Sequence, residues 1–149
     1  MYFKYRFILV PITALIICQI IKFTLESIKC KELRFDRLLN GAGGMPSTHT
    51  TFSISLTTLV GLEIGASDPL FAVCLIFSMI VSYDAIGVRY ESGKQAEAIN
   101  DLVEDLITNK KQKLNYKVLK EQLGHKPLEV LGGLILGFTV SFIFYTFIF

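Results

Sequence analysis

Hydrophobic residues gather in four long runs, which polar stretches separate: 7–23, 50–66, 70–88 and 128–149. Each run approaches the roughly 17 to 25 apolar residues with which an α-helix crosses a bilayer. The second run is short and contains several serines and threonines as well as Glu63. We therefore expect it to be a short or re-entrant helix buried against its neighbours. The pattern predicts an all-α membrane bundle of about four membrane helices.

The turn between the second and third runs fixes the predicted topology. Residues 65–69 predict a tight turn in which Asp68 caps the next helix and Pro69 occupies its first turn. The resulting hairpin puts the loops 24–49 and 89–126 on one side of the membrane and both termini on the other. Because most lysines and arginines border these two loops, the positive-inside rule predicts that the loops are cytoplasmic.

The first run and the second loop complete the predicted elements. The first run follows Lys4 and Arg6, as in a signal peptide, but no small-residue cleavage site comes after it. We expect it to remain as the first membrane helix. In the second loop, helical spacing of apolar residues predicts a helix over 96–107, and a shorter helix over 116–123 would end at Gly124. These amphipathic helices are predicted to lie on the membrane surface or to cap the bundle.

Composition favours one integral membrane domain over residues 1–149, located in the cell membrane. Of the 149 residues, 52% are hydrophobic, and the mean hydropathy of +0.51 exceeds that of ordinary soluble domains. The lipid bilayer is the expected partner, whereas a formal net charge of +2 gives no reason to expect nucleic acid. The three cysteines lack paired spacing and are predicted to be reduced. Nothing in these patterns specifies an oligomeric state.

A glycine-rich turn precedes the second run and reads Asn-Gly-Ala-Gly-Gly-Met-Pro-Ser-Thr-His-Thr-Thr over residues 40–51. Helix starts after glycines bind anions through backbone N–H groups, and Gly44, Ser47 and Thr48 would supply such donors and hydroxyls. His49 is placed to donate a proton to a leaving oxygen. The alternative is an N-capped helix after a flexible turn, with His49 at the membrane interface.

A second polar cluster stands at the end of the third run. Asp84 is a carboxylate within an apolar helix, so it needs a partner, for which Arg89 is the candidate. With Lys94, Arg89 predicts a cationic clamp on phosphate, in which Asp84 and Gln95 have structural or orienting roles. The alternative is a helix-end ion pair, with Arg89 and Lys94 reaching lipid head groups.

A third cluster opens the last run. His125 and Glu129 stand four residues apart, so in a helix they would share one face. Glu129 would then accept a hydrogen bond from one ring nitrogen and leave the other free as a nucleophile or base. Gly133, Gly137 and Ser141 continue this face and predict close packing against another helix. The alternative is a histidine near a helix start, with a glutamate in the first turn, where the helix dipole favours it.

Together the three clusters resemble a small, divergent bacterial and plant branch of the type 2 phosphatidic acid phosphatase and vanadium haloperoxidase superfamily. The matching strings are Gly-Gly-Met-Pro-Ser-Thr-His at 43–49, Asp-Ala-Ile-Gly-Val-Arg at 84–89, Gly-Lys-Gln at 93–95 and Leu-Gly-His-Lys-Pro-Leu-Glu-Val at 123–130. Their order and spacing cover nearly the whole chain. In the superfamily a P-S-G-H motif supplies a phosphate-binding serine and a general-acid histidine. The resemblance implies these roles for Ser47 and His49, with Thr48 in place of the glycine.

A later superfamily motif, S-R-x5-H-x3-D, supplies a phosphate-binding arginine, a histidine nucleophile and its orienting aspartate. The resemblance assigns the last two roles to His125 and Glu129. Val118 and Leu119 stand where the serine and arginine would be, so Arg89 is the expected substitute. The K-x6-R-P motif is absent as well, and the candidates to replace it are Lys94 with Arg89, or Arg34 with Arg37.

The resemblance implies a phosphoric monoester hydrolase acting through a phosphohistidine on His125 at the cytoplasmic membrane face. Glu129 would orient His125, and His49 would protonate the leaving alkoxide. The expected phosphate-binding residues are Ser47, Arg89, Lys94, Gly44 and Thr48. A lipid phosphate such as phosphatidic acid or phosphatidylglycerol phosphate fits this reading, and no metal or cofactor is required. The alternatives are a non-enzymatic membrane protein that binds anionic head groups or serves in assembly, and a metal site built from His49, His125, Glu129 and Asp84.

Overall fold

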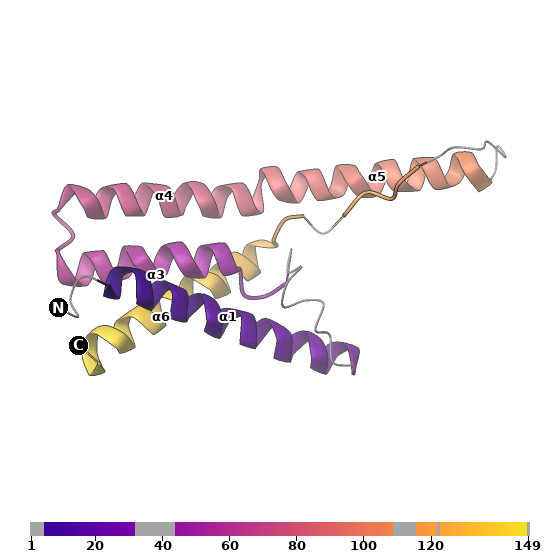
Figure 1. Cartoon of the computed structure of the whole chain (residues 1–149). Coiled ribbons are helices and arrows are strands. Elements are labelled where there is room, and N and C mark those ends of the chain that lie inside the picture. Colours follow the sequence, from indigo (N-terminus) through magenta and orange to yellow (C-terminus); the bar gives the residue numbers. More distant parts are fainter. Residues whose placement is uncertain (1–4, 32–43, 109–115, 122, 149) are drawn as a thin grey trace.

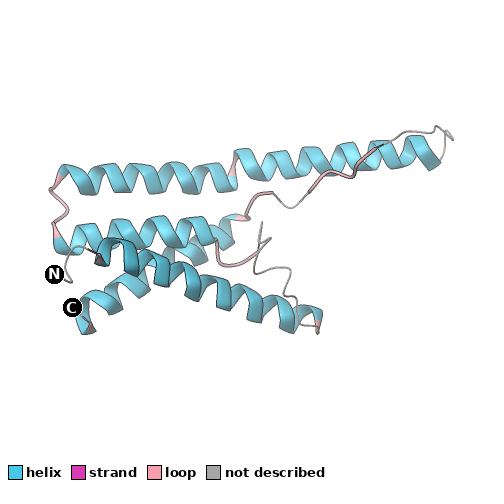
Figure 2. Ribbon diagram, viewed as in Figure 1, coloured by secondary structure: helices cyan, strands magenta, loops and turns pink. Residues whose placement is uncertain are grey.

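The computed structural model describes residues 5–31, 44–108, 116–121 and 123–148, and every regular element in these ranges is a helix (Figure 2). The helices are α1 (Arg6–Cys30), α3 (Thr48–Glu63), α4 (Pro69–Ile86), α5 (Val88–Thr108) and α6 (Pro127–Phe147). The predicted all-α class is therefore confirmed. The first helix is longer than its apolar run, since it continues seven residues past Phe23 to Cys30.

Within the described residues, three helices are long and apolar enough to cross a membrane: α1, the continuous α4–α5 pair and α6. The central helix α3 has 16 residues, which is about 24 Å at 1.5 Å per residue. That length falls short of the roughly 30 Å hydrocarbon core of a bilayer. The second segment is thus short, as its composition predicts, and it begins at Thr48 and ends at Glu63.

The bundle is organised around α3, which packs against α1, α4 and α6. Its hydroxyl side chains are turned inward and bond to the neighbouring helices. The hydroxyl oxygen of Ser55 lies 2.7 Å from that of Ser141 on α6, and the hydroxyl oxygen of Thr57 lies 2.8 Å from that of Ser78 on α4. Hydroxyl pairs of this kind join helices where apolar contacts give no driving force over lipid. The serines and threonines of the second run therefore reflect its central position.

Glycines let α6 approach the backbone of α3. A Cβ atom at Gly133 would lie 2.6 Å from the carbonyl oxygen of Ser47, and one at Gly137 would lie 2.5 Å from that of Thr51. Any larger residue would push the two helices apart, so only glycine permits this spacing. The predicted packing face of the last helix is confirmed.

Both termini lie at the same end of the bundle as the turn between α3 and α4 (Figure 1). At that turn Asp68 caps α4 by accepting a hydrogen bond of 2.8 Å from the N–H of Leu70. Nearby, the buried Arg6 forms an ion pair with Glu63, which explains how a glutamate is accommodated in an apolar run. We call the opposite end, where α3 and α6 begin and α4 ends, the motif end.

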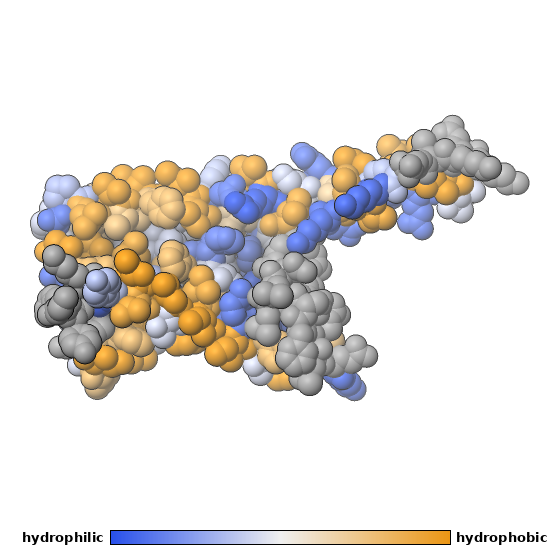
Figure 3. All heavy atoms as spheres, viewed as in Figure 1, coloured by the Kyte–Doolittle hydropathy of each residue, from blue (hydrophilic) through white to orange (hydrophobic). Residues whose placement is uncertain are grey.

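Helix α5 continues from α4 beyond the motif end, away from the bundle (Figure 1). Hydrophobic residues dominate the visible face of the bundle, and hydrophilic residues gather at the motif end and along α5 (Figure 3). The predicted amphipathic helix over 96–107 is thus confirmed, but it projects from the bundle and does not cap it. The predicted helix over 116–123 is wrong, because the described residues 116–121 and 123 are not helical. Asn100 holds this segment, bonding both the N–H and the carbonyl of Leu119 at 2.9 Å.

Candidate functional site

A cavity of about 140 Å³ opens at the motif end between α3, α4 and the chain that enters α6. We call it the histidine cavity, because its lining includes both histidines of the protein, together with Asp84, Arg89, Val81, Ala85 and Leu123. Three motifs that are far apart in the sequence therefore meet at one site. The histidines lie there on opposite elements, His49 on α3 and His125 in the loop before α6.

The loop carrying His125 is fixed against the end of α4 and the start of α5. The backbone N–H of His125 donates a hydrogen bond of 3.0 Å to the carbonyl of Ala85. A Cβ atom at Gly124 would collide with the backbone of Tyr90, and one at Gly93 would collide with the carbonyl oxygen of Glu121. These two glycines allow the loop to lie directly on α5, and so they determine where His125 stands.

The His125 side chain is buried, with 6% of the residue exposed. Neither ring nitrogen has a hydrogen-bond partner in the described part of the chain. Burial, followed by the positive charge of Lys22 and smaller contributions from His49 and Arg89, lowers the pKa of His125 from 6.5 to about 4. The imidazole is therefore neutral at pH 7, which leaves one nitrogen with a lone pair for attack.

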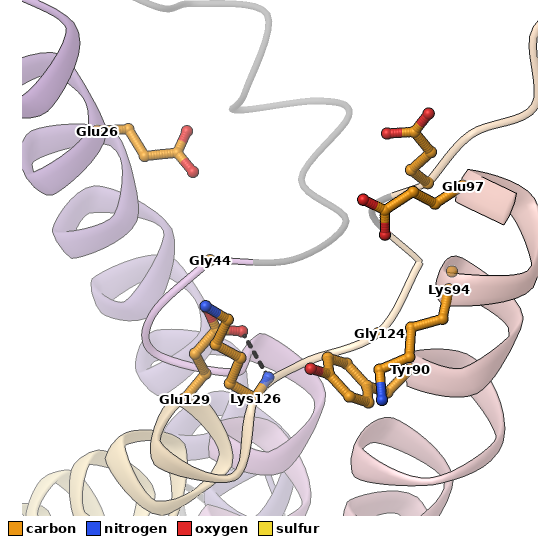
Figure 4. A pocket seen from close by; sticks show the side chains of 10 residues that line it. Glu26, Gly44, Tyr90, Lys94, Glu97, Gly124, Lys126 and Glu129 are labelled. Carbon is orange, nitrogen blue, oxygen red and sulfur yellow. Dashed lines mark hydrogen bonds between the residues drawn. The ribbon is translucent and has the colours of Figure 1, made fainter. Parts of the chain in front are cut away.

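Glu129 does not orient His125 in this structure, contrary to the prediction from their spacing. Pro127 starts α6, so His125 lies outside the helix and the two side chains do not share a helical face. The Glu129 carboxylate instead accepts a hydrogen bond of 3.1 Å from the N–H of Lys126 and caps α6 (Figure 4). A proline at the first helical position followed by a glutamate at the third is a common helix start, and here the capping bond takes the carboxylate.

Ser47 joins the starts of α3 and α6, and its side chain is not part of the lining of the histidine cavity. It is fully buried, and its N–H donates a hydrogen bond of 2.8 Å to the carbonyl of Glu129. Its hydroxyl accepts a hydrogen bond of 3.0 Å from Thr50. His49 is the second residue of α3 and is exposed toward the cavity. Ser47 thus fixes the place from which His49 projects.

Lys22 is a site residue that the sequence patterns did not single out. It lies on α1 with 5% of its surface exposed, and its ammonium group donates a hydrogen bond of 3.4 Å to the hydroxyl of Thr48. Its charge acts on His125, so it belongs to the surroundings of the histidine cavity. The available signal was a lysine flanked by Ile21 and Phe23, near the end of an apolar run.

Arg89 and Lys94, predicted to form one clamp, are separated. Arg89 lines the histidine cavity and donates a hydrogen bond from Nε to the carboxylate of Asp84, so the predicted ion pair is confirmed. Lys94 instead pairs with Glu91 at 3.1 Å and lies over the ring of Tyr90. Gln95 is exposed on α5. Arg34 and Arg37 lie outside the described residues.

A second, larger cavity of about 400 Å³ lies beside the first, on the α5 side of the motif end (Figure 4). Charged residues of both signs line it: Glu26, Glu97, Glu121, Glu129, Lys94 and Lys126. Gly44 also lines it, with a positive φ of 82°, and a Cβ atom there would lie 2.9 Å from the carboxylate of Glu26. Lys94, Gly44 and Glu129 therefore belong to this second cavity and not to the one that holds the histidines.

The metal-site alternative finds no matching geometry in the ranges that the structure describes. There, no group of three or more His, Cys, Asp or Glu side chains is arranged to hold a metal ion. Asp84 lies with the two histidines, but its carboxylate is paired with Arg89, and Glu129 faces the other cavity. The arrangement is instead one of two histidines with nearby cations, which suits an anionic ligand.

Fold and site together define a polytopic helical membrane protein with a cavity lined by two histidines and an arginine at one end of its bundle. The chain belongs to the divergent PAP2 family, whose profile matches residues 3–140. It is 37% identical over 145 residues to the "Uncharacterized membrane protein YuiD" of Bacillus subtilis (strain 168), and the alignment covers 91% of each chain. No solved structure matches the chain significantly.

Proposed function

We propose that the protein is a lipid phosphate monoester phosphatase in which His125 is the nucleophile. The observation that carries the proposal is a buried histidine beside Arg89 and His49 whose ring nitrogens have no partner among the described residues. A buried polar group without a partner costs about 1–3 kcal/mol. A phosphate group would supply that partner, and the neighbouring cations would attract it.

In the proposed first step, the neutral imidazole of His125 attacks the phosphorus atom. A nitrogen–phosphorus bond forms as the phosphorus–oxygen bond to the lipid breaks, and His49 gives its proton to the leaving alkoxide. Arg89 and Lys22 stabilise the charge on the transferring phosphoryl group, which is the main contribution of a protein to such reactions. In the second step water attacks the phosphohistidine, its proton returns to His49, and inorganic phosphate leaves.

Glu129 acts in this proposal as a positioning residue. It caps α6, and its carbonyl holds the N–H of Ser47, so it joins the starts of the two helices that flank the site. The orientation of His125 comes instead from its backbone bond to Ala85 and from the packing of its loop on α5. Replacing Glu129 is therefore expected to affect stability more than the chemical step.

The proposed substrates follow from the side of the membrane that the site faces. Most lysines and arginines of the sequence border the loops 24–49 and 89–126, so the positive-inside rule favours a cytoplasmic motif end. A lipid made on that leaflet, such as phosphatidic acid or phosphatidylglycerol phosphate, would reach the histidine cavity without crossing the bilayer.

A second candidate is a non-enzymatic protein that binds anionic lipid head groups. It is favoured by one observation, the absence of a carboxylate bonded to His125 in the described structure. Histidine nucleophiles and bases are usually oriented by such a partner. Under this alternative the same cations would hold a head group, and no ester bond would break.

Phosphate release from a panel of lipid phosphates, with purified protein in detergent, separates the two candidates. We expect release from phosphatidic acid or phosphatidylglycerol phosphate, its loss in His125→Asn, and a strong reduction in Lys22→Met. Lys29→Met is the matched control, since Lys29 is exposed two turns further along α1. Circular dichroism would show that each variant is folded. Release that persists in folded His125→Asn, or no release from any lipid, would contradict the proposal.

A further inference from the structure

An apolar groove of about 390 Å³ runs over the outer face of α3, between α1 and α4. Leu15 of α1, Phe52 of α3, and Phe77 and Val81 of α4 line it, and its surface is almost entirely carbon. Both flanking helices pack on α3, but in the described part of the chain they do not contact each other. Helix packing therefore leaves the space between them open over α3.

The two most exposed residues of α3 lie in the groove. Of the 16 residues of this helix, only His49 and Phe52 are exposed, and both line the groove. The remaining α3 side chains are buried or half-buried against the other helices. Phe77 on the opposite wall is 58% exposed, and little of the apolar part of α4 is buried against the other helices. A bilayer around the protein would therefore border the groove directly.

The groove and the histidine cavity meet at two residues. His49 and Val81 line both spaces. The histidine cavity is polar, since Arg89 and His125 line it, whereas almost only apolar atoms line the groove. A ligand that fills both must carry an anionic group next to a hydrocarbon chain, which is the form of a lipid phosphate.

On the basis of the proposed function, we infer that the groove holds one acyl chain of the substrate lipid while its phosphate occupies the histidine cavity. The lipid would then enter sideways from the bilayer between α1 and α4. An acyl chain is favoured over a protein segment because the groove continues into a polar cavity that holds the Arg89 guanidinium and both histidines, where the apolar face of a helix from a second copy would bring no phosphate.

This placement also orders the two histidines along the reaction. The oxygen that leaves with the lipid must point toward the groove, and His49 stands where groove and cavity join. His125 lines the histidine cavity but not the groove. In-line displacement requires the nucleophile and the leaving oxygen on opposite sides of the phosphorus. The groove thus explains why His49 is the acid and His125 the nucleophile.

A cross-linking experiment tests the groove without depending on turnover. Phosphatidic acid with a photoreactive diazirine in one acyl chain would be added to His125→Asn protein in phosphatidylcholine micelles and irradiated. We expect adducts at Leu15, Phe52 or Phe77 that excess unlabelled phosphatidic acid suppresses and excess phosphatidylcholine does not. Adducts spread evenly over the lipid-facing residues of α4 and α6, or insensitive to phosphatidic acid, would overturn the inference.

Matched variants test the same groove through substrate preference. For soluble short-chain phosphatidic acids, each added methylene should raise kcat/KM by up to roughly fourfold, from 0.8 kcal/mol per methylene. Leu15→Trp should flatten this dependence, and Ile16→Trp, an exposed neighbour outside the groove, should leave it unchanged. If kcat/KM depends on chain length equally in both variants, the groove does not bind the acyl chain, but the proposed phosphatase activity would still stand. If the protein is a dimer in detergent and Phe77→Ala converts it into monomers, the groove would instead be assigned to a second copy of the chain.

Discussion

The protonation state of His125 gives the sharpest prediction, because it depends on burial and nearby charge and not on turnover. The pKa of this ring is lowered from 6.5 to about 4, first by burial and then by Lys22. At pH 6, a pKa of 4 leaves about 1% of the rings protonated, whereas a pKa of 6.5 would leave about three quarters protonated. The two cases are easily separated.

Nuclear magnetic resonance of histidine-labelled protein in micelles measures this pKa. The chain has two histidines, so His49→Asn leaves His125 as the single signal. We expect it to titrate near pH 4, or slightly above, since the charge of His49 also lowers the pKa. Lys22→Met should move the midpoint upward, and Lys29→Met should not. A midpoint near 6.5 in the folded protein would refute the burial and charge environment described here.

The same pKa shift makes stability depend on pH. Unfolded His125 takes up a proton near pH 6.5, but the folded protein takes it up only near pH 4, so the unfolded state binds more protons between these values. Stability is therefore full above pH 6.5 and is lost as the pH falls toward 4. The loss is at most roughly 3 kcal/mol, and solvent screening of the ring makes it smaller. Thermal unfolding should show a steeper loss of stability with falling pH in the native protein than in His125→Gln.

Three further predictions test the bundle and its orientation. Gly137→Val should lower the melting temperature, because its Cβ would lie 2.5 Å from a backbone oxygen of α3 and overpacking costs about 1–3 kcal/mol; unchanged stability would show that α6 sits further from α3. In a double-mutant cycle, Ser55→Ala and Ser141→Ala should each cost about 1 kcal/mol and together less than their sum, whereas simple additivity would argue against their hydrogen bond. A membrane-impermeant maleimide should label the exposed Cys30 in inverted vesicles but not in intact cells, and labelling in intact cells would reverse the proposed orientation.

The elements that sequence patterns predicted well are those set by local chemistry. Membrane helices follow from runs of apolar residues, and the turn at Asp68 and Pro69 follows from capping preferences. The segment over 116–121 was mispredicted because its helical spacing could not reveal that Asn100 would take its backbone hydrogen bonds. Tertiary contacts of this kind override local propensity.

The candidate site was predictable as a set of motifs but not as an arrangement. His49, Arg89 and His125 were each identified, and the structure brings them to one cavity. Lys94 was misplaced because its partner Glu91 lies three residues away on the same helix and holds it on α5. Lys22 was missed because its place near the histidine cavity depends on how α1 packs against α3. The spacing of residues within one helix does not predict that packing.

Trapping the intermediate would show whether His125 becomes phosphorylated. The protein would be mixed with phosphatidic acid, quenched within milliseconds in alkali, which preserves phosphohistidine, and analysed by mass spectrometry of its peptides. We expect a phosphoryl group on His125 in the native protein and none in His125→Asn. Phosphate release without any phosphoryl group on residue 125 would contradict it.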